Sequence, residues 1–157
     1  MSSIRSRAPA AASPAVRKVM VANVGRERRP ERRLRSLLHR AGLRFRKDSP
    51  PEEGVRCRAD IVFRRPRVCV FVDGCFWHGC PRHFRLPKTN SEWWAEKIRD
   101  NMERDVRKTG ELQDRGWEVI RVWEHDVAGS RDRVAAVVQA VKRVCEERRP
   151  QDAKSHS

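Results

Sequence analysis

The sequence predicts a single mixed α/β domain in which helices flank one central sheet. The chain has 157 residues, and about 150 residues is a usual size for one domain. Apolar residues recur at helical spacing, then in two short strand-like runs, and the pattern continues as loop, helix, strand and helix. Strands interleaved with helices are typical of a layered α/β fold. We expect the domain to occupy residues 25–146, between a flexible basic arm at 1–24 and a polar disordered tail at 147–157.

The first predicted element is a helix that begins near Pro30 and ends at Gly42. Proline suits the first helical position because its missing N–H has no partner there in any case, and glycine is a frequent C-terminal stop. The apolar residues between these limits recur at helical spacing: Leu34, Leu37, Leu38 and Ala41. This spacing predicts a helix with one buried face and an arginine-rich outer face.

The remaining elements follow from apolar spacing and turn residues. Residues 60–63 and 68–72 are short apolar runs and predict an antiparallel hairpin. A long helix is expected over 91–115, with Trp94, Ile98 and Met102 on one apolar side. It is followed by a strand over 117–123, in which side chains of different polarity alternate. A last helix is expected from Arg131, with valines at helical spacing.

The charge of the chain indicates its partner. Lys and Arg number 36 against 21 Asp and Glu, which gives a formal charge of +15. Such an excess attracts phosphate backbones, so nucleic acid is the first partner to consider, although an arginine-rich protein of another kind remains an alternative.

No run approaches the ~20 apolar residues of a membrane span, and the N-terminal residues lack the apolar stretch of a secretory signal. We therefore expect a cytoplasmic protein with no membrane partner.

The loop at residues 74–83, GCFWHGCPRH, contains potential metal ligands. Zinc prefers four sulfur or nitrogen ligands, and the spacing of Cys75, Cys80 and His83 allows three donors to converge. His125 is the best candidate for the fourth, because it follows the strand at 117–123 and adjacent strands can bring their ends together. The alternative is a reduced cysteine pair beside surface histidines.

A second group of residues predicts hydrolytic chemistry. His78 is spaced wrongly to join the other ligands on one ion, which leaves it available for acid–base catalysis. Asp60 and Asp73 stand at the two ends of the predicted hairpin. Paired carboxylates at strand ends can hold Mg²⁺, which stabilises charge on a phosphate under attack. Two aspartates alone also fit a purely structural role.

Four segments together carry a family resemblance. They are ADIVF at 59–63, VFVDGCFWHGC at 70–80, NMERD at 101–105 and GWEVIRVWE at 116–124. In this order they resemble the very-short-patch-repair (Vsr) DNA mismatch endonucleases. The similarity covers about residues 18–129, and the Gly-Cys-Phe-Trp-His core is highly specific.

This resemblance implies a fold similar to type II restriction endonucleases, with a structural zinc added. It also implies a Mg²⁺-dependent nick 5′ to the mismatched thymine of a T:G pair, the lesion left when 5-methylcytosine deaminates. By position, Asp60 would bind Mg²⁺ together with the main-chain carbonyl of Val72, and His78 would be the general base. Glu31 and Asp105 match acidic positions that support the catalytic site.

The resemblance also assigns three side chains to DNA intercalation. Phe76 and Trp77 would wedge into the base stack beside the mismatch, where a wobble pair costs less to unstack than a Watson–Crick pair. Met20 matches a residue that inserts from the opposite groove. The alternative for Phe76 and Trp77 is packing in the core.

The chain departs from the best-known form of the family at two positions. Asp73 stands where that form has histidine, so it either binds metal directly or orients a water molecule. His125 stands where cysteine is more usual as the fourth zinc ligand, and a Cys₂His₂ set is chemically acceptable.

By the resemblance, the protein acts as a bacterial, nucleoid-associated monomer linked to a cytosine DNA methyltransferase, a repair polymerase and a ligase. Two other functions remain open. One is a restriction-like nuclease of broader specificity. The other is a non-catalytic, zinc-stabilised DNA-binding protein in which Asp60 and His78 are structural.

Overall fold

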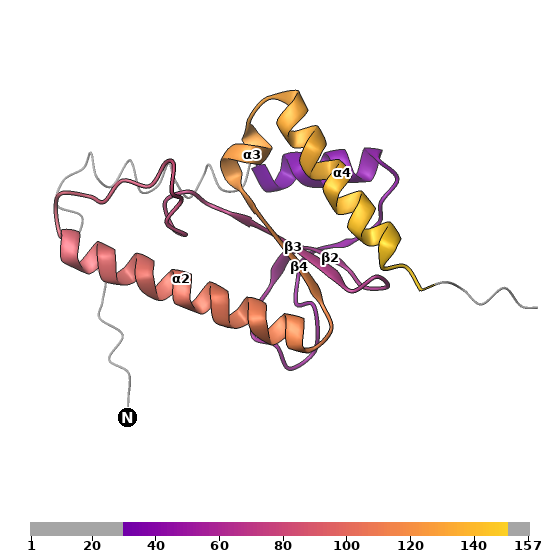
Figure 1. Ribbon diagram of the computed structural model, residues 1–157, viewed down its shortest axis with the longest axis horizontal. Coiled ribbons are helices and arrows are strands. Elements are labelled where there is room, and N and C mark those ends of the chain that lie inside the picture. Colours follow the sequence, from indigo (N-terminus) through magenta and orange to yellow (C-terminus); the bar gives the residue numbers. More distant parts are fainter. Residues whose placement is uncertain (1–29, 151–157) are drawn as a thin grey trace, which may run out of the picture.

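The computed structural model describes residues 30–150, and it contains one four-stranded sheet between helices (Figure 1). A helix covers residues 30–40 at the start of the described chain. The later elements are β1 (Arg46–Ser49), β2 (Ala59–Phe63), β3 (Val68–Asp73), α2 (Ser91–Asp114), β4 (Glu118–Trp123), α3 (Glu124–Ala128) and α4 (Arg131–Glu147). The predicted mixed α/β class with one sheet is confirmed. None of the helices within 30–150 combines the length and apolar character needed to cross a bilayer.

The sheet is mixed, with the strand order β1-β2-β3-β4. β2 and β3 form the predicted antiparallel hairpin, with Ile61 opposite Val70. β4 lies parallel to β3, with Asp73 opposite Trp123 at its end. Because β2 and β3 run in opposite directions, the start of β2 and the end of β3 lie at the same edge of the sheet. The end of β4 lies there too, and this edge holds the site described below.

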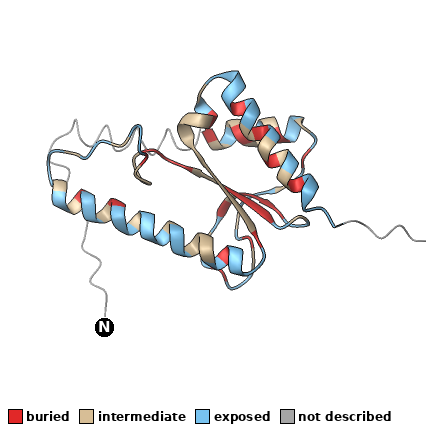
Figure 2. Cartoon of the chain, viewed as in Figure 1, coloured by how far each residue is buried: buried red, intermediate tan, exposed pale blue. Residues whose placement is uncertain are grey.

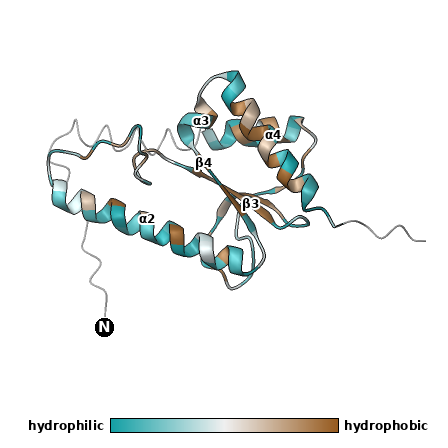
Figure 3. Ribbon diagram, viewed as in Figure 1, coloured by the Kyte–Doolittle hydropathy of each residue, from teal (hydrophilic) through white to brown (hydrophobic). Residues whose placement is uncertain are grey.

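Helices cover both faces of the sheet. The helix at 30–40 and α4 pack on one face, and α2 packs by its C-terminal part on the other (Figure 1). Figure 2 shows the buried residues concentrated in the strands and on the inner sides of the helices. Figure 3 shows the apolar side of α4 turned toward the helix at 30–40. Leu34 and Leu38 are fully buried in this layer, and truncating either to alanine typically costs about 2–5 kcal/mol.

The turn from α2 into β4 shows why the chain reverses where it does. Gly116 has φ +86°, a left-handed conformation that side chains with a Cβ rarely adopt. The N–H of Trp117 donates to the carbonyl of Leu112 at 3.0 Å, and the N–H of Gly116 donates to that of Gln113 at 2.9 Å. These two bonds satisfy carbonyls that the helix end leaves open, and they direct the chain back along the sheet.

The structure contains two elements that were not predicted, and it contradicts one expectation about α2. β1 was not predicted, because its residues RKDS have no apolar alternation, and it pairs at the edge of the sheet through its backbone. α3 was not predicted, because five residues are too few to show helical spacing. Met102 was expected to share the apolar side of α2 with Trp94 and Ile98, but its side chain is exposed while theirs are buried.

Candidate active site

The shared edge of β2 and β3 opens into a small cavity of about 280 Å³. Its lining combines four acidic side chains, one histidine and three cations, and among these are Glu31, Asp60, Asp73, His78, Asp105, Lys108 and Arg121. These residues come from the first described helix, three strands, the loop after β3, and α2. The fold therefore brings the five predicted catalytic residues, Asp60, Asp73, His78, Glu31 and Asp105, to one place.

Asp60 is held through both its side chain and its main chain. Its Oδ2 accepts a hydrogen bond from the N–H of Val72 at 2.7 Å. Its main-chain carbonyl accepts two hydrogen bonds from Arg35, at 3.2 and 3.1 Å. Burial raises the pKa of the Asp60 carboxyl, and the Val72 N–H and the Glu31 side chain oppose this rise. A partly buried carboxylate near a second acidic group is an oxygen-rich environment that a divalent cation would stabilise.

Asp73 is paired with an arginine. The Nη1 atom of Arg121 lies 2.9 and 3.2 Å from the two carboxylate oxygens of Asp73. Burial raises the pKa of Asp73, while the nearby His78 and Arg121 lower it. The pair lies on adjacent parallel strands and faces the cavity.

His78 is oriented by Asp105 of α2. The Nδ1 atom of His78 makes a short hydrogen bond to Oδ2 of Asp105, and it lies 3.8 Å from Oδ1 of Asp73. Since an ionised carboxylate only accepts hydrogen bonds, Nδ1 carries the proton in the neutral imidazole, and Nε2 then has the lone pair. This tautomer is the one in which Nε2 can accept a proton.

The loop that carries His78 lies directly on α2. The side-chain amide of Asn101 donates to the carbonyl of Trp77 at 3.2 Å. Gly79 has φ +64°, and a Cβ there would stand 2.9 Å from Sδ of Met102 and 3.1 Å from Cγ2 of Ile98. Only glycine permits both this conformation and this close approach to α2. The contact therefore fixes the loop at the point between His78 of the cavity and Cys80, a predicted zinc ligand.

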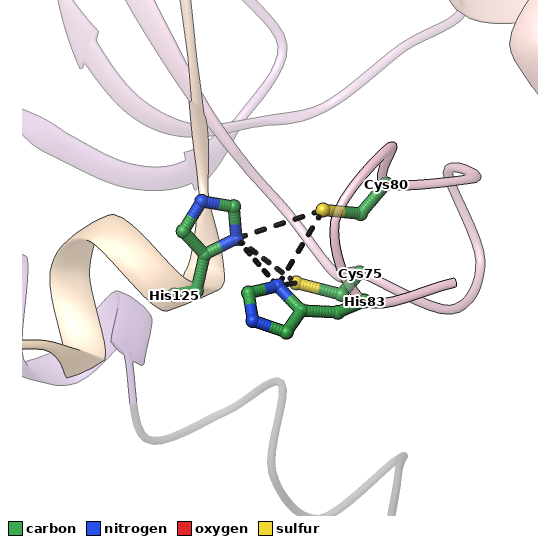
Figure 4. A group of neighbouring side chains, drawn as sticks. All are labelled: Cys75, Cys80, His83 and His125. Carbon is green, nitrogen blue, oxygen red and sulfur yellow. Dashed lines mark hydrogen bonds between the residues drawn. The ribbon is translucent and has the colours of Figure 1, made fainter. Parts of the chain in front are cut away.

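Figure 4 shows the second group of the loop, in which Cys75, Cys80, His83 and His125 point toward one centre. Their ligand atoms all lie within 4.8 Å of one another. The four sulfur–nitrogen distances are 3.3, 3.6, 3.7 and 3.8 Å, and the two Nδ1 atoms are 3.2 Å apart. A tetrahedral zinc ion holds a sulfur and a nitrogen about 3.6 Å apart and two nitrogens about 3.4 Å apart, given its usual bond lengths. The donor set therefore fits a tetrahedral ion of that size.

Acidic residues next to the Cys/His cluster support this geometry. Oδ1 of Asp126 lies 3.5 Å from Nε2 of His125, the nitrogen that faces away from the cluster. Such carboxylates commonly orient a metal-binding histidine. Oε1 of Glu124 accepts a hydrogen bond from the N–H of Cys75 at 3.0 Å, which connects the loop to the end of β4.

Phe76 and Trp77 belong to an aromatic group over the start of α2. Both are partly exposed, and each ring packs on that of the buried Trp94, at centroid distances of 5.3 and 5.8 Å. The two rings lie edge to face against each other at 5.1 Å. Phe76 and Trp77 thus form a partly exposed aromatic surface that rests on Trp94. In the sequence they stand between Cys75 of the Cys/His cluster and His78 of the cavity.

Comparisons with known proteins identify the family. A family model described as DNA mismatch endonuclease Vsr matches residues 12–83. Type II nicking enzyme V.NaeI of Lentzea aerocolonigenes is 47% identical over 124 residues, which are 78% of this chain and 74% of the relative. Type II nicking enzyme V.XorIIP of Xanthomonas oryzae pv. oryzae is 42% identical over 122 residues, 74% of this chain and 85% of the relative. DNA mismatch endonuclease Vsr of Escherichia coli is 43% identical over 100 residues, 63% of this chain and 62% of the relative.

This chain belongs to the Vsr family of DNA mismatch endonucleases. It is therefore a DNA endonuclease, and the expectation of a nuclease whose partner is DNA is confirmed. A nuclease of the Vsr family implies a divalent metal. The oxygen donors around Asp60 fit such an ion, because the carboxyl groups of Asp60 and Glu31 interact with each other and line the same cavity, and divalent cations such as Mg²⁺ prefer oxygen ligands.

Sequence reasoning about this Vsr protein missed Arg121, Arg35 and Lys108. Arg121 alternates with apolar residues in β4, so its pattern indicated only a strand. Arg35 lies on the arginine-rich side of the first described helix, where nothing in the sequence distinguishes it from its neighbours. Met20, the third predicted intercalating residue, lies outside the described residues.

Proposed function

We propose that this protein makes a Mg²⁺-dependent nick in one DNA strand, 5′ to the mismatched thymine of a T:G pair, and so initiates very short patch repair of deaminated 5-methylcytosine. The observation that carries the proposal is the cavity in which Asp60, His78 and Asp105 face one small volume of about 280 Å³. The names of the relatives, which are mismatch endonucleases and nicking enzymes, support the same reaction.

Each residue of the cavity has a distinct part in phosphodiester hydrolysis. Asp60 and the main-chain carbonyl of Val72 would hold Mg²⁺, and the Glu31 carboxyl group supplies further oxygen atoms beside Asp60. When bound, the ion would neutralise charge that develops on the phosphate oxygens.

His78 is the proposed general base. Its Nδ1 is held by Asp105, so Nε2 can take a proton from the attacking water. Asp105 stabilises the imidazolium that results, as the orienting acid of a catalytic triad does. The water oxygen attacks phosphorus, and the 3′ oxygen of the preceding nucleotide leaves, so the product is a nick.

The Cys/His cluster is the proposed structural zinc site, with Cys75, Cys80, His83 and His125 as ligands. Four protein ligands complete a tetrahedron and leave no position for substrate, as in other structural zinc sites. The ion would fix the loop that carries His78 to the end of β4. The proposal includes a fold of the restriction-endonuclease-like class, which this mixed sheet with flanking helices resembles.

Phe76 and Trp77 are the proposed wedge beside the mismatch, with Met20 inserting from the opposite groove. Their half-exposed rings rest on Trp94, so they can stack on bases without first being pulled from the core. A T:G pair is easier to unstack than a matched pair, which links recognition to deformability. The protein is proposed to act as a monomer, in functional association with a cytosine DNA methyltransferase, a repair polymerase and a ligase.

A strand-specific nicking assay tests the function. Duplexes of one sequence are labelled on either strand and carry T:G, another mismatch or no mismatch, in several flanking contexts, with and without Mg²⁺. We expect a Mg²⁺-dependent cut 5′ to the thymine in T:G duplexes alone.

Two other outcomes lead to the alternatives. Cutting of matched or differently mismatched duplexes would indicate a broader restriction-like nuclease. DNA binding without any Mg²⁺-dependent cut would indicate a non-catalytic, zinc-stabilised DNA-binding protein.

A further inference from the structure

Arg121 links the acidic residues of the cavity to one another. Its three guanidinium nitrogens each have a different partner. Nη1 contacts both carboxylate oxygens of Asp73, at 2.9 and 3.2 Å. Nη2 lies 3.8 Å from Oδ1 of Asp105, and Nε donates to Oγ1 of Thr109 at 2.9 Å. The guanidinium also lies 4.4 Å from the centre of the Phe71 ring, so contacts from β3 and α2 fix it in place.

We propose that Arg121 is a positioning residue that holds Asp73 away from the catalytic metal and, through Asp105, aligns His78. This inference rests on the proposed function of the cavity. It concerns Asp73, for which the sequence left two roles open, direct metal binding or orientation of a water molecule. In the structure, Asp73 is the partner of the Arg121 guanidinium, whereas Asp60, the proposed metal-binding carboxylate, accepts a hydrogen bond from the main-chain N–H of Val72.

The surroundings of the two aspartates support this division. Asp60 has a main-chain N–H on one oxygen and the Glu31 side chain nearby. An added acidic neighbour favours a divalent ion at Asp60. At Asp73 both oxygens already face the positive Nη1 of Arg121, and one of them also faces His78 at 3.8 Å. A second cation on Asp73 would have to displace the guanidinium.

The link through Asp105 explains how a residue on β4 can affect the base. Oδ2 of Asp105 accepts the hydrogen bond from Nδ1 of His78, and Oδ1 faces Nη2 of Arg121. Arginine therefore holds the carboxylate that orients the imidazole. Lysine has a single nitrogen and cannot occupy all three positions. A lysine at position 121 would keep the charge next to Asp73 and lose the alignment of Asp105.

Metal binding without DNA tests the first half of the proposal. Zinc-loaded protein is titrated with Mn²⁺, and free Mn²⁺ is measured by electron paramagnetic resonance. We expect Asp73→Asn to match the wild type within about twofold and Asp60→Asn to bind about 10–100-fold more weakly. Arg121→Gln should bind Mn²⁺ more tightly, or take up an additional ion, because it releases the carboxylate of Asp73. Arg121→Lys should bind as the wild type does.

Single-turnover nicking of a T:G duplex tests the second half. At saturating DNA, Arg121→Gln and Arg121→Lys should both be slower by about 10–100-fold, while the Kd for DNA changes less than about threefold. The double variant Asp73→Asn/Arg121→Gln replaces the ion pair with two amides, and it keeps the test valid where the single variant does not fold. It should bind Mn²⁺ as the wild type does and remain slow, because Asp105 still lacks its cation.

The outcomes separate this inference from the proposed function. Loss of Mn²⁺ binding in Asp73→Asn equal to that in Asp60→Asn would make Asp73 a metal ligand and overturn the inference, although nicking remained. Unchanged Mn²⁺ binding in Arg121→Gln, or nicking by Arg121→Lys at the wild-type rate, would also overturn it. Failure of the wild type to nick any duplex would instead reject the proposed function.

Discussion

The Cys/His cluster and the carboxylate cavity differ in every respect that decides what a metal site does, although one loop serves both. The cluster has four sulfur and nitrogen donors whose separations match the edges of a tetrahedron. The cavity has oxygen donors from separate elements, around an open volume of about 280 Å³. Its carboxylates are held by main-chain groups and by arginine. The protein completes the first site, whereas the second leaves room for a phosphate.

This difference separates structural from catalytic chemistry within ten residues of sequence. Cys75, His78 and Cys80 alternate between the two sites along the loop, and Gly79 presses the loop onto α2. Fixing the cluster therefore fixes the position of His78. Substitutions in the cavity should affect rate, substitutions in the cluster should affect stability, and each of the following experiments tests that separation.

The largest effect is expected at Asp60. Asp60→Asn keeps an oxygen to accept the Val72 N–H but removes the charge that would hold Mg²⁺, so nicking should fall by at least about 10³-fold. Zinc content and the Kd for DNA should stay within about twofold of the wild type, because the cluster and the basic surface are unchanged. Single-turnover nicking, zinc analysis and a DNA-binding titration measure the three quantities.

Asp114→Asn is the matched control for Asp60→Asn, since Asp114 is exposed at the end of α2. It should nick at the wild-type rate. Nicking by Asp60→Asn at the wild-type rate would show that Asp60 does not hold the catalytic metal, and the proposal that the cavity is the active site would fail.

A smaller loss of rate is expected at His78. His78→Gln can still donate to Asp105 but has no group to accept a proton at neutral pH, so nicking should slow by about 10²–10³-fold. DNA binding should change much less than the rate, because a general base acts in the transition state. His39→Gln, on the exposed side of the first described helix, is the control. Equal losses of binding and rate in His78→Gln would argue that His78 is structural.

The third experiment removes the cluster. Wild-type protein purified without chelator should hold about one zinc ion per chain, and Cys80→Ser should lose it and about 3–5 kcal/mol of unfolding free energy. Cys145→Ser removes a buried thiol that lies in α4, outside the cluster, and should keep the zinc. Metal analysis and chemical denaturation are the measurements. Absence of zinc from the wild type would leave the cluster without its ligand assignment.

The sequence predicted the elements whose apolar spacing is strong. The hairpin, α2 and β4 begin and end within one residue of their predicted limits, and α4 begins at the predicted Arg131, because their buried faces dictate the pattern. β1 and α3 were not predicted for physical reasons. β1 is a polar edge strand held by its pairing with β2, and α3 is shorter than two helical turns.

The candidate site was predictable where a motif carried it. Asp60, His78 and the four Cys/His residues stand in a loop and strands whose sequence is distinctive, and the structure brings each group together. The role of Arg121 was not predictable, because a single arginine among the apolar residues of a strand indicates only that its side chain lies on the more polar face of the sheet. Its role follows from the parallel pairing of β3 with β4, which sets Phe71 opposite Arg121 and Asp73 two residues farther along β3, on the same face as Phe71.

The smallest effect is expected at Trp77, and it tests whether the loop also supplies recognition. Trp77→Ala removes a half-exposed ring that rests on Trp94, so the preference for T:G over matched duplex should fall by about tenfold, on the order of one lost stacking contact. Trp93→Ala is the matched control, because Trp93 packs on the same Trp94 ring at 4.8 Å but lies on α2 and not on the loop. Competition nicking of T:G and matched duplexes measures the preference, and denaturation of both variants measures any loss of stability. A loss of preference in Trp77→Ala alone, at equal stability of the two variants, would mean that the loop contacts the mismatch. Equal losses in both would mean that the aromatic group only supports the fold, and recognition would then belong to other residues.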